Sequence, residues 1–497
     1  MTTSLELNER NLPLLAARAT IPTYARERLA PGVVHISVGS FHRAHQALYF
    51  EEIAARGLDE RWGITGVGLH RREMKAALDA QDGLYTVVSR SPRGDDARIV
   101  GVITRYLFAP EERAAVLDAL ADERTRLVTL TITAAGYKVH PDTGAFLSED
   151  DAVVEDLSRP SEPGTALGLL VEALDRRRRA GRAPFTVLSC DNMADNGTVV
   201  GTAVVAFASL RDERLGRWIE ENVAFPGSMV DRITPGTTDA DRAMVERTFG
   251  IRDRWPVMTE PYSQWVVEDR FCQGRPPLDE VGVQLVDDVR PYALTKTRLL
   301  NASHSALGYL GSLAGYGRID QVMADPVFAG YIEKMMAEEI APLLPRTEID
   351  LSAYGTTLRR RFANPAVADR LSRLCRSGST KVPAHLLSSV REALQAGRPH
   401  ALLTLAVAGW CRYLRAVDAH GRPFPLDDAN GERLRALAGA AGDDPRRLLA
   451  DEATFGSLGS CPAFVEAVER DLRQLEAIGS RAVIRGRITG DEHLLAS

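Results

Sequence analysis

The chain has 497 residues, of which 45% are hydrophobic and 26% are charged, as in an ordinary globular protein. One hydrophobic core rarely serves so long a chain, so we expect two domains. The formal net charge of −6 offers no broad basic surface to nucleic acid or an anionic membrane, and a small molecule is the expected partner.

The first half of the sequence alternates short runs rich in Val, Ile, Leu and Thr with stretches of helical periodicity. Such alternation favours an α/β domain whose mostly parallel sheet is covered on both faces. The predicted strands are 33–38, 63–69, 85–89, 98–108, 127–133 and 185–189, and the predicted helices include 47–55, 111–121 and 166–179.

Four consecutive arginines, Arg176 to Arg179, end the last of these helices shortly before Gly181. Cations suit the negative end of a helix dipole, and Gly commonly follows a helix C-terminus. We therefore interpret the run as structural rather than as a nucleic-acid site.

From about Pro291 onward the pattern changes to long helical segments with almost no strand-like alternation. This predicts an all-α domain over 291–497 after an α/β domain over 1–290, with the Pro-rich, charged segment 273–291 as the connection. The predicted helices include 292–314, 326–344, 385–396, 401–417 and 463–478.

The five cysteines lie far apart and form no C-x-x-C pair. This spacing indicates neither a disulfide framework nor a zinc cluster, and it fits a reducing cytosol. The first ten residues carry charges where a signal peptide needs an apolar core, and no run approaches the roughly 18 apolar residues of a membrane span. We expect a cytoplasmic protein without a membrane partner.

A tight turn containing Ser37, Gly39, Ser40 and Phe41 joins the first predicted strand to a helix. In α/β proteins this turn is where a dinucleotide pyrophosphate meets free backbone N–H groups. The usual glycine pair is incomplete, because Ser37 stands two residues before Gly39, so the turn alone is a weak fingerprint. The glycines of 63–68 lie inside and at the end of the second strand, and we interpret them as strand residues.

Lys296, Asn301 and His304 occur at helical spacing in an otherwise apolar run. At about 100° per residue, Asn301 lies roughly 140° and His304 roughly 80° around the axis from Lys296, so all three can face one cleft. A buried lysine can act as a base, and an amide and an imidazole can steady the oxygen that loses its proton. The alternative is an amphipathic helix with ordinary polar residues.

Two further candidates lie in the first half. Asn192 follows a predicted strand, where α/β enzymes place functional side chains, although such residues are also common turn formers and helix caps. Asp231 and Arg232 stand in an apolar context, which is equally compatible with a buried structural ion pair.

Taken together, several segments occur in the order seen in polyol-specific long-chain dehydrogenases. The sequence resembles the mannitol dehydrogenase family, which also contains arabinitol and sorbitol dehydrogenases and the fructuronate and tagaturonate reductases. The resemblance covers nearly the whole chain and rests on the segments 34–45, 190–192, 230–235, 259–265, 296–304 and 373–383.

The resemblance implies a Rossmann-like dinucleotide-binding domain over 1–290 and a helical substrate and catalytic domain over 291–497. It further implies hydride transfer between NAD(P) and a secondary alcohol of an acyclic polyol such as mannitol, arabinitol or sorbitol, without a metal. Lys296 would be the general base, with Asn301 and His304 beside it and Asn192 as the second carboxamide. The residues expected to face substrate hydroxyls or tune the site are Asp231, Arg373 and Lys381.

Some positions depart from the family pattern. Ser37 replaces the first glycine of the turn, and Ala134 and Ala293 replace glutamates that are common in the family. After the second strand, Arg71 and Arg72 stand where an early acidic residue is usual. An acid there binds the ribose of NAD, whereas arginine accommodates the 2′-phosphate of NADP, so the resemblance implies NAD with NADP as an alternative.

Two other functions stay open at this stage. Arg373 and Lys381 could bind a carboxylate, as in a hexuronate reductase acting on fructuronate and mannonate or on tagaturonate and altronate. A protein that binds the cofactor without turnover is the second, and the intact Lys296, Asn301 and His304 set argues against it. Family tendency implies a monomer or a small homo-oligomer.

Overall fold

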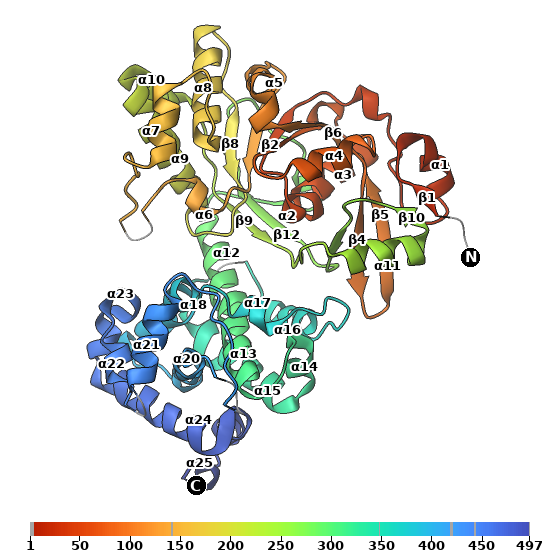
Figure 1. Cartoon of the computed structure of the whole chain (residues 1–497). Coiled ribbons are helices and arrows are strands. Elements are labelled where there is room, and N and C mark those ends of the chain that lie inside the picture. The colour runs from red at the N-terminus through yellow and green to blue at the C-terminus, as the bar shows by residue number, and fades with distance from the viewer. Residues whose placement is uncertain (1–3, 141–142, 347, 418–420, 442–443, 497) are drawn as a thin grey trace. The chain divides into compact units, whose positions relative to one another are not determined.

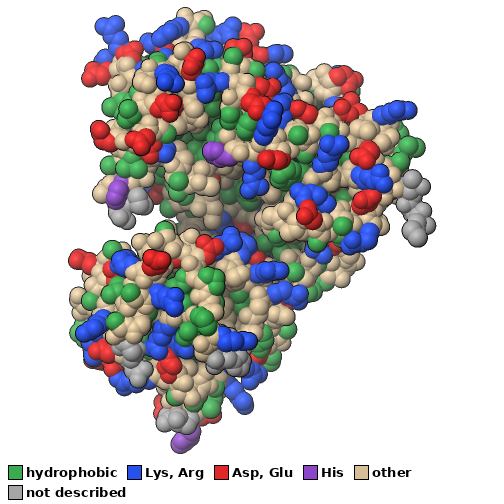
Figure 2. Space-filling view, viewed as in Figure 1, with side chains coloured by type: hydrophobic (Ala, Val, Ile, Leu, Met, Phe, Trp, Pro, Cys, Tyr) green, Lys and Arg blue, Asp and Glu red, His purple; other side chains and the backbone are tan. Residues whose placement is uncertain are grey.

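The computed structural model describes residues 4–140, 143–346, 348–417, 421–441 and 444–496. The chain separates into two compact units, Met1–Arg290 and Pro291–Ser497 (Figure 1). Acidic and basic side chains are intermixed among the described residues of the face shown in Figure 2. Among the described residues, no helix has the length and apolar character needed to cross a bilayer.

The first unit is built around a five-stranded sheet with the strand order β6-β3-β2-β7-β8, in which every neighbouring pair is parallel. Numbered within this sheet, the order is the 3-2-1-4-5 of a doubly wound nucleotide-binding fold, and it reverses between β2 and β7. The predicted α/β class is therefore confirmed. The strands are β2 Val33–Ile36, β3 Ile64–Gly68, β6 Ile103–Phe108, β7 Leu127–Leu130 and β8 Thr186–Ser189.

Both faces of this sheet are buried, as the apolar composition of its strands predicts. In β2, Val34 and Ile36 pack into one hydrophobic cluster, and Val33 packs into another on the opposite face, because side chains alternate along a strand. The first cluster includes helices α5 Ala109–Ala121, α8 Ala166–Arg179 and α9 Asn196–Arg211, and the second includes α3 Gln46–Ala55 and α4 Arg72–Asp79.

The prediction of one strand over 98–108 is wrong. The backbone N–H groups of Gly101 and Val102 each donate to Glu51 Oε2 at 2.9 Å, so the chain leaves one sheet there and enters another. The first part pairs antiparallel with β4, which runs parallel to β11, so the predicted strand 85–89 also belongs to a separate sheet. These strands are β4 Tyr85–Ser91, β5 Gly94–Val100 and β11 Val257–Thr259.

A further small sheet has the order β13-β12-β9, and its edge strand β13 lies within the segment predicted as a plain connection. Its strands are β9 Ser228–Asp231, β12 Gln264–Glu268 and β13 Gln284–Val286, and β1 Leu5–Glu6 pairs with β10 Ile251–Arg252. The remaining elements of this unit are η1 Glu9–Asn11, α1 Leu12–Leu15, η2 Arg26–Arg28, α2 Ser40–Ala44, η3 Glu60–Trp62, α6 Thr133–Gly136, α7 Asp151–Ser158, α10 Glu213–Asn222, α11 Asp239–Phe249 and η4 Asp279–Val281.

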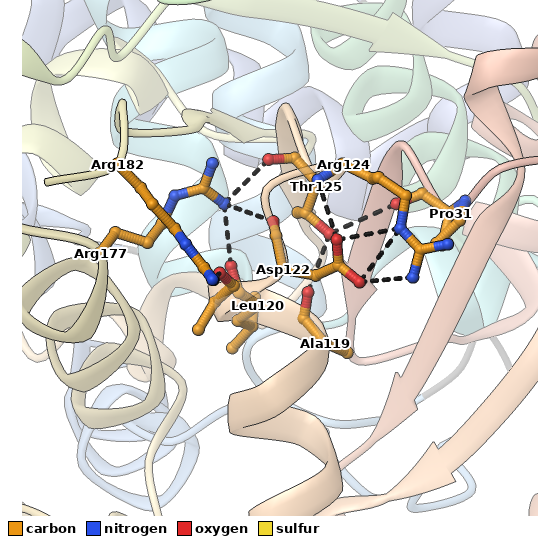
Figure 3. Close-up of polar contacts among 9 residues, drawn as sticks. Pro31, Ala119, Leu120, Asp122, Arg124, Thr125, Arg177 and Arg182 are labelled. Atoms are coloured by element: carbon orange, nitrogen blue, oxygen red, sulfur yellow. Dashed lines mark hydrogen bonds and ion pairs between the residues drawn. The ribbon is translucent and has the colours of Figure 1, made fainter. Parts of the chain in front are cut away.

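The arginine run at the end of α8 is structural, as predicted. Arg177 is buried, and Figure 3 shows its guanidinium directed at the chain that follows α5. Its Nη1 donates to the carbonyls of Leu120, Asp122 and Thr125 at 3.1, 2.9 and 2.9 Å. These contacts bind carbonyls at the C-terminus of α5 and in the turn that follows it. The other three arginines form ion pairs with Glu172 and Asp175.

The second unit is helical around one hydrophobic cluster, to which α20 contributes most of its length and α13 contributes Ala302, Ala306, Leu307, Tyr309 and Leu310. Three of the predicted long helices contain a π-helical segment instead of continuing as α-helix. The α-helices are α12 Arg290–Thr295, α13 Ala302–Leu313, α14 Ile319–Ala324, α15 Pro326–Lys334, α16 Leu351–Phe362, α17 Leu371–Leu374, α18 Gly378–Val382, α19 Ser388–Gln395, α20 Ala401–Tyr413, α21 Gly431–Ala441, α22 Arg446–Leu449, α23 Glu452–Phe455, α24 Pro462–Thr489 and α25 Glu492–Ala496.

The π-helices are η5 Lys296–Asn301, η6 Met335–Ile340 and η8 Pro383–Leu387, and η5 contacts both of the others. The 3₁₀ segments of this unit are η7 Ala341–Leu343 and η9 Gly456–Ser460. Single π turns inside α-helices are rare and occur frequently at functional sites. The grouping of three of them therefore marks this part of the second unit for attention.

Candidate functional site

The turn after β2 stands at the point where the strand order of the parallel sheet reverses. Ser37 has a φ of 73°, the left-handed region that favours glycine. The N–H groups of Ser37 and Val38 both donate to the Val67 carbonyl, at 2.8 and 3.2 Å, and Thr131 Oγ1 donates to the Ser37 carbonyl at 2.9 Å. These bonds hold a serine in a conformation that a glycine would adopt without strain.

Helix α2 begins directly after this turn, at Ser40. A Cβ atom built on Gly39 has only the Ser37 carbonyl oxygen near it, at 4.0 Å, so the backbone is open to a close approach. Ser40 and Phe41 are half-buried, while the rest of α2 is buried. Free N–H groups of a first helical turn are the usual partners of a pyrophosphate, and this cradle fits one.

The glycines of the second strand have a different role. Cβ atoms on Gly66 and Gly68 would lie 3.3 Å from Tyr106 Cδ2 and 2.1 Å from Tyr106 Oη, respectively. Both residues lie within β3. They are glycines because the Tyr106 ring packs on the strand, in agreement with the interpretation from the sequence.

Two buried histidines flank the turn after β2, one in the strand before it and one in the helix after it. His35 of β2 and His42 of α2 stack with ring centroids 3.4 Å apart. His35 Nδ1 and Nε2 lie 2.7 and 3.0 Å from Thr129 Oγ1 and Thr131 Oγ1. Burial lowers the pKa of His35 to about 3, and burial also lowers the pKa of His42 well below its ordinary value. Both rings are therefore neutral at neutral pH.

The two arginines after β3 are both exposed. Arg72 Nε forms an ion pair with Glu111 Oε1 at 2.8 Å. Arg71 precedes α4 and makes no ion pair with any residue that the structure describes. The two candidates for a 2′-phosphate are thus not equivalent, and Arg71 is the less engaged one.

The loop after β8 is fixed by the neighbours of Asn192. The Asp191 carboxylate accepts hydrogen bonds from the N–H groups of Ile132 and Thr133, each at 2.9 Å, and from Tyr137 Oη at 2.6 Å. Asn196 Nδ2 donates to the Ser228 carbonyl at 2.9 Å. The flanking residues are held by these bonds, and Asn192 between them is exposed.

Asp231 ends β9 and is 5% exposed. The adjacent Arg232 donates from Nη1 to the Ala44 carbonyl at 2.7 Å and from Nη2 to the Glu260 carbonyl at 2.9 Å. Arg232 therefore links the last residue of α2 to the residue that follows β11, and its role is structural.

In the second unit, Lys296 and Asn301 are the first and last residues of the π-helix η5, and His304 follows in α13. The angles expected for a regular α-helix do not apply, because each π turn closes on i+5 instead of i+4. Lys296 is 6% exposed. Arg298 fixes the segment by donating to the Leu343 carbonyl at 3.2 Å and pairing with Glu392 at 2.5 Å.

His304 lies among cations. Its ring packs against that of Phe362, with the ring centroids 4.6 Å apart. Its buried Nε2 has no hydrogen-bond partner among the described residues. Burial, followed by the positive charges of Arg373 and Arg361, lowers the pKa of His304 well below its ordinary value. A buried, neutral and unsatisfied imidazole nitrogen fits a hydrogen bond to a bound molecule.

Arg373 and Lys381 also belong to this neighbourhood. Arg373 Nε donates to Asp369 Oδ1 at 2.6 Å, and Nη2 pairs with the second carboxylate oxygen. Lys381 Nζ donates to the Leu374 carbonyl at 3.4 Å. Burial and then the charge of Arg373 lower the pKa of Lys381.

Two residues of this region were missed in the sequence. Asp369 lies just before α17 and precedes Arg373 by four positions, and His385 follows Lys381 by four within the helical stretch of α18 and η8. His385 Nδ1 lies 3.4 Å from Ser305 Oγ, and burial and then the charges of Lys381 and Lys296 lower the pKa of His385 to about 3. The spacing was visible, but neither residue lies in a recognisable motif.

The cysteines and acids do not assemble into a metal centre within the described ranges, where no group of three or more His, Cys, Asp or Glu side chains could hold an ion. All five cysteines are free thiols.

Residues 31–280 match the family model for the mannitol dehydrogenase Rossmann domain, and residues 288–476 match that for the mannitol dehydrogenase C-terminal domain. The chain belongs to the mannitol dehydrogenase family. Two family models thus cover most of both units, which confirms the resemblance drawn from the sequence motifs.

Named relatives agree with this assignment. A mannitol dehydrogenase from Saccharomyces cerevisiae is 44% identical over 91% of each chain, and a mannitol 2-dehydrogenase from Phaeosphaeria nodorum is 43% identical over 97% of this chain and 85% of its own. The solved mannitol 2-dehydrogenase of Pseudomonas fluorescens, a ternary complex with NAD and D-mannitol, is 40% identical, with a TM-score of 0.88 over 98% of this chain and 100% of its own. A solved substrate-free D-sorbitol dehydrogenase is 35% identical, with a TM-score of 0.90 over 97% and 100%.

Proposed function

We propose that this protein is an NAD-dependent polyol dehydrogenase that oxidises a secondary alcohol of an acyclic polyol, with mannitol as the first substrate to test. The observation that carries the proposal is the buried Lys296 on a π turn with Asn301 and His304, in a chain of the mannitol dehydrogenase family. The Pseudomonas fluorescens relative, whose structure contains NAD and D-mannitol, supports the choice of cofactor and substrate.

In the proposed reaction Lys296 is the general base that takes the hydroxyl proton of the substrate. Asn301 donates a hydrogen bond to the oxygen as it becomes an alkoxide, and Asn192 of the first unit has the same proposed role. A donor of this kind contributes about 3 to 4 kcal/mol to transition-state stabilisation. His304 acts as a neutral hydrogen-bonding partner, because its lowered pKa disfavours the imidazolium. NAD, when bound, supplies the nicotinamide that accepts the hydride.

The cofactor contacts that we propose come from the turn after β2, with Ser37, Gly39, Ser40 and Phe41 holding the pyrophosphate through backbone groups. Arg71 is the proposed residue for any use of NADP. In the second unit, Arg373 and Lys381 are the proposed partners of substrate hydroxyls, and Asp231 of the first unit is the proposed acceptor.

An absorbance assay of the nicotinamide with a panel of polyols and hexuronates tests this proposal. We expect reduction of NAD with mannitol, sorbitol or arabinitol, and the activity should survive exhaustive chelation because the proposed base is a lysine. Turnover of hexuronates alone would contradict the polyol assignment, and activity that chelation removes and zinc restores would contradict metal independence.

We also propose a cytoplasmic location, which the separate free cysteines support. The proposed working form is a monomer or a small homo-oligomer, which light scattering of the purified protein distinguishes.

A further inference from the structure

The backbone around Asp369 is fixed by its contacts with the chain at Arg318 and Ile319. The Ile319 N–H donates to the Asp369 carbonyl at 3.1 Å, and the next residue, Arg370, forms a β-bridge with Arg318. The residue before it, Ala368, has a φ of 52°, which is unfavourable for a side chain with a Cβ. Such strain persists only where the surroundings determine the conformation, so the position of the Asp369 carboxylate is imposed by the fold.

The carboxylate of Asp369 occupies one edge of the Arg373 guanidinium. Nε and Nη2 both bind it, in the two-pronged geometry that gives the strongest arginine pairs. The Asp369 side chain is 3% exposed, whereas that of Arg373 is 45% exposed. The acid is therefore inaccessible to a substrate, while the arginine still presents Nη1 outside the pair.

Arg373 lies close enough to His304 and Lys381 for its charge to act on both, and at Lys381 the negative charge of Asp369 opposes that of Arg373. It therefore presents donors at the candidate site with its positive charge already offset. A hydroxyl needs only a donor and binds such a guanidinium normally. A carboxylate binds more strongly to an unbalanced cation, and here it would also meet the negative charge of Asp369. Repulsion of this kind is how sites reject a competing ligand.

Lys381 is a second cation that a substrate carboxylate could use, in addition to the buried Arg361 whose charge also acts on His304. Lys381 is partly buried, and burial and then the charge of Arg373 lower its pKa, while the charge of Asp369 opposes this more weakly. Asp369 thus removes the stronger carboxylate partner, and the position of Lys381 weakens the second.

We propose that Asp369 is a specificity-determining residue that makes the site select neutral polyols over hexuronates by neutralising Arg373. The proposal rests on the polyol dehydrogenase function proposed above and names the residue that excludes the related sugar acids. Asp369 acts through Arg373 and is a positioning residue, so a change in substrate preference is the required readout.

The test is Asp369→Asn, which keeps the side-chain shape and removes the charge. We expect the ratio of kcat/KM for a hexuronate (fructuronate reduction) to kcat/KM for the matched neutral ketose (fructose reduction) to rise by about ten- to a hundredfold. A ratio unchanged within about twofold overturns the proposal. Asp369→Glu keeps the charge and should keep the wild-type preference; a shift in that variant equal to the shift in Asp369→Asn also counts against it.

Asp325→Asn is the matched control. Asp325 is a buried acid of the same unit whose two carboxylate oxygens bind Arg481 at 2.5 and 3.3 Å, and its side chain is 6% exposed. Its loss removes a comparable pair away from Arg373, so the substrate ratio should not move. A shift of the ratio in this control as large as that in Asp369→Asn overturns a specific role for Asp369.

If Asp369→Asn does not fold, Asp369→Ser serves as a second neutral variant, and inhibition of the wild type provides a measurement without mutation. Mannonate should bind the wild type at least tenfold more weakly than mannitol. Equal binding overturns the proposal. If the wild type oxidises polyols but the variants keep the same substrate ratio, only the role of Asp369 is refuted. If the wild type does not oxidise polyols, the proposed function itself is refuted.

Discussion

The two candidate sites of this protein differ in whether the backbone or the side chains supply the expected contacts. The turn after β2 offers backbone N–H groups and an open glycine, and it holds Ser37 in a left-handed conformation. The second unit instead offers side chains, Lys296, Asn301 and His304, on and beside a π turn. Backbone recognition tolerates many sequences, whereas proton transfer requires particular side chains.

This difference explains why one region was easier to predict from the sequence than the other. The turn lacks its first glycine, and only its position after the first strand pointed to a pyrophosphate. The lysine, asparagine and histidine suggest proton transfer by their chemistry and spacing, and they became specific only together with the other segments of the family pattern. Substitutions of Lys296, Asn301 and His304 should therefore affect turnover, whereas substitutions in the turn after β2 should affect mainly stability.

The largest expected effect is that of Lys296→Ala. Removal of a general base costs about 10²- to 10⁴-fold in turnover, while binding of NAD should stay nearly unchanged because the cofactor residues are intact. Steady-state kcat and a fluorescence titration of NADH measure the two quantities. In the wild type, polyol oxidation should accelerate as pH rises and the lysine loses its proton.

Lys334→Ala is the matched control for this experiment. Lys334 is a half-buried lysine of the same unit, and its Nζ donates to the Ile488 carbonyl at 3.3 Å. Its loss should leave kcat unchanged. Full activity of Lys296→Ala, or a flat pH profile from mildly acidic to alkaline conditions, would refute the lysine as base.

Much of this architecture followed from the sequence. The strands of the parallel sheet and the helical second half were predictable because periodicity and composition are local properties. The break at Gly101 was not, because it depends on the distant Glu51 carboxylate. Nor was the π turn at Lys296, since one extra residue in a turn leaves the apolar pattern almost intact. Asp369 was missed because it lies outside the recognised segment 373–383, although its partner Arg373 was among the residues expected to face the substrate or tune the site.

The second prediction concerns acid stability of the first region. In the unfolded chain a histidine has a pKa of about 6.5, while burial lowers the pKa of His35 to about 3 and that of His42 well below its ordinary value. The unfolded chain therefore binds protons first as pH falls. The free energy of unfolding is therefore unaffected by these two histidines above about pH 6.5. Below that pH it falls by about 1.4 kcal/mol per pH unit for each histidine.

Urea unfolding at neutral pH and near pH 5 measures this loss. His42→Phe keeps an aromatic ring against His35 and removes one titrating group, so the dependence of stability on pH should become shallower. An equal slope in the variant and the wild type would show that His42 does not titrate on unfolding.

The third prediction separates the two arginines after β3. If Arg71 reaches the 2′-phosphate of NADP, its charge-assisted bonds contribute about 1.5 to 3 kcal/mol, or ten- to a hundredfold in cofactor preference. Arg71→Ala should then lower kcat/KM for NADP relative to NAD. Arg72→Ala is the control, because Arg72 is engaged by Glu111. Unchanged preference in Arg71→Ala would mean that Arg71 does not contact the phosphate.

The smallest expected effect is that of Ser37→Gly. A residue with a Cβ at a φ of 73° is strained by about 1 kcal/mol or more, and glycine relieves that strain, although it adds entropy to the unfolded chain. Thermal unfolding should show a net gain of up to about 1 kcal/mol, with NAD affinity little changed. Ser40→Gly is the opposite control, because Ser40 is helical and glycine there costs about 0.5 to 1 kcal/mol. Destabilisation by both substitutions would show that the side chain of Ser37 contributes more than its backbone strain costs, and that this turn depends on a side chain after all.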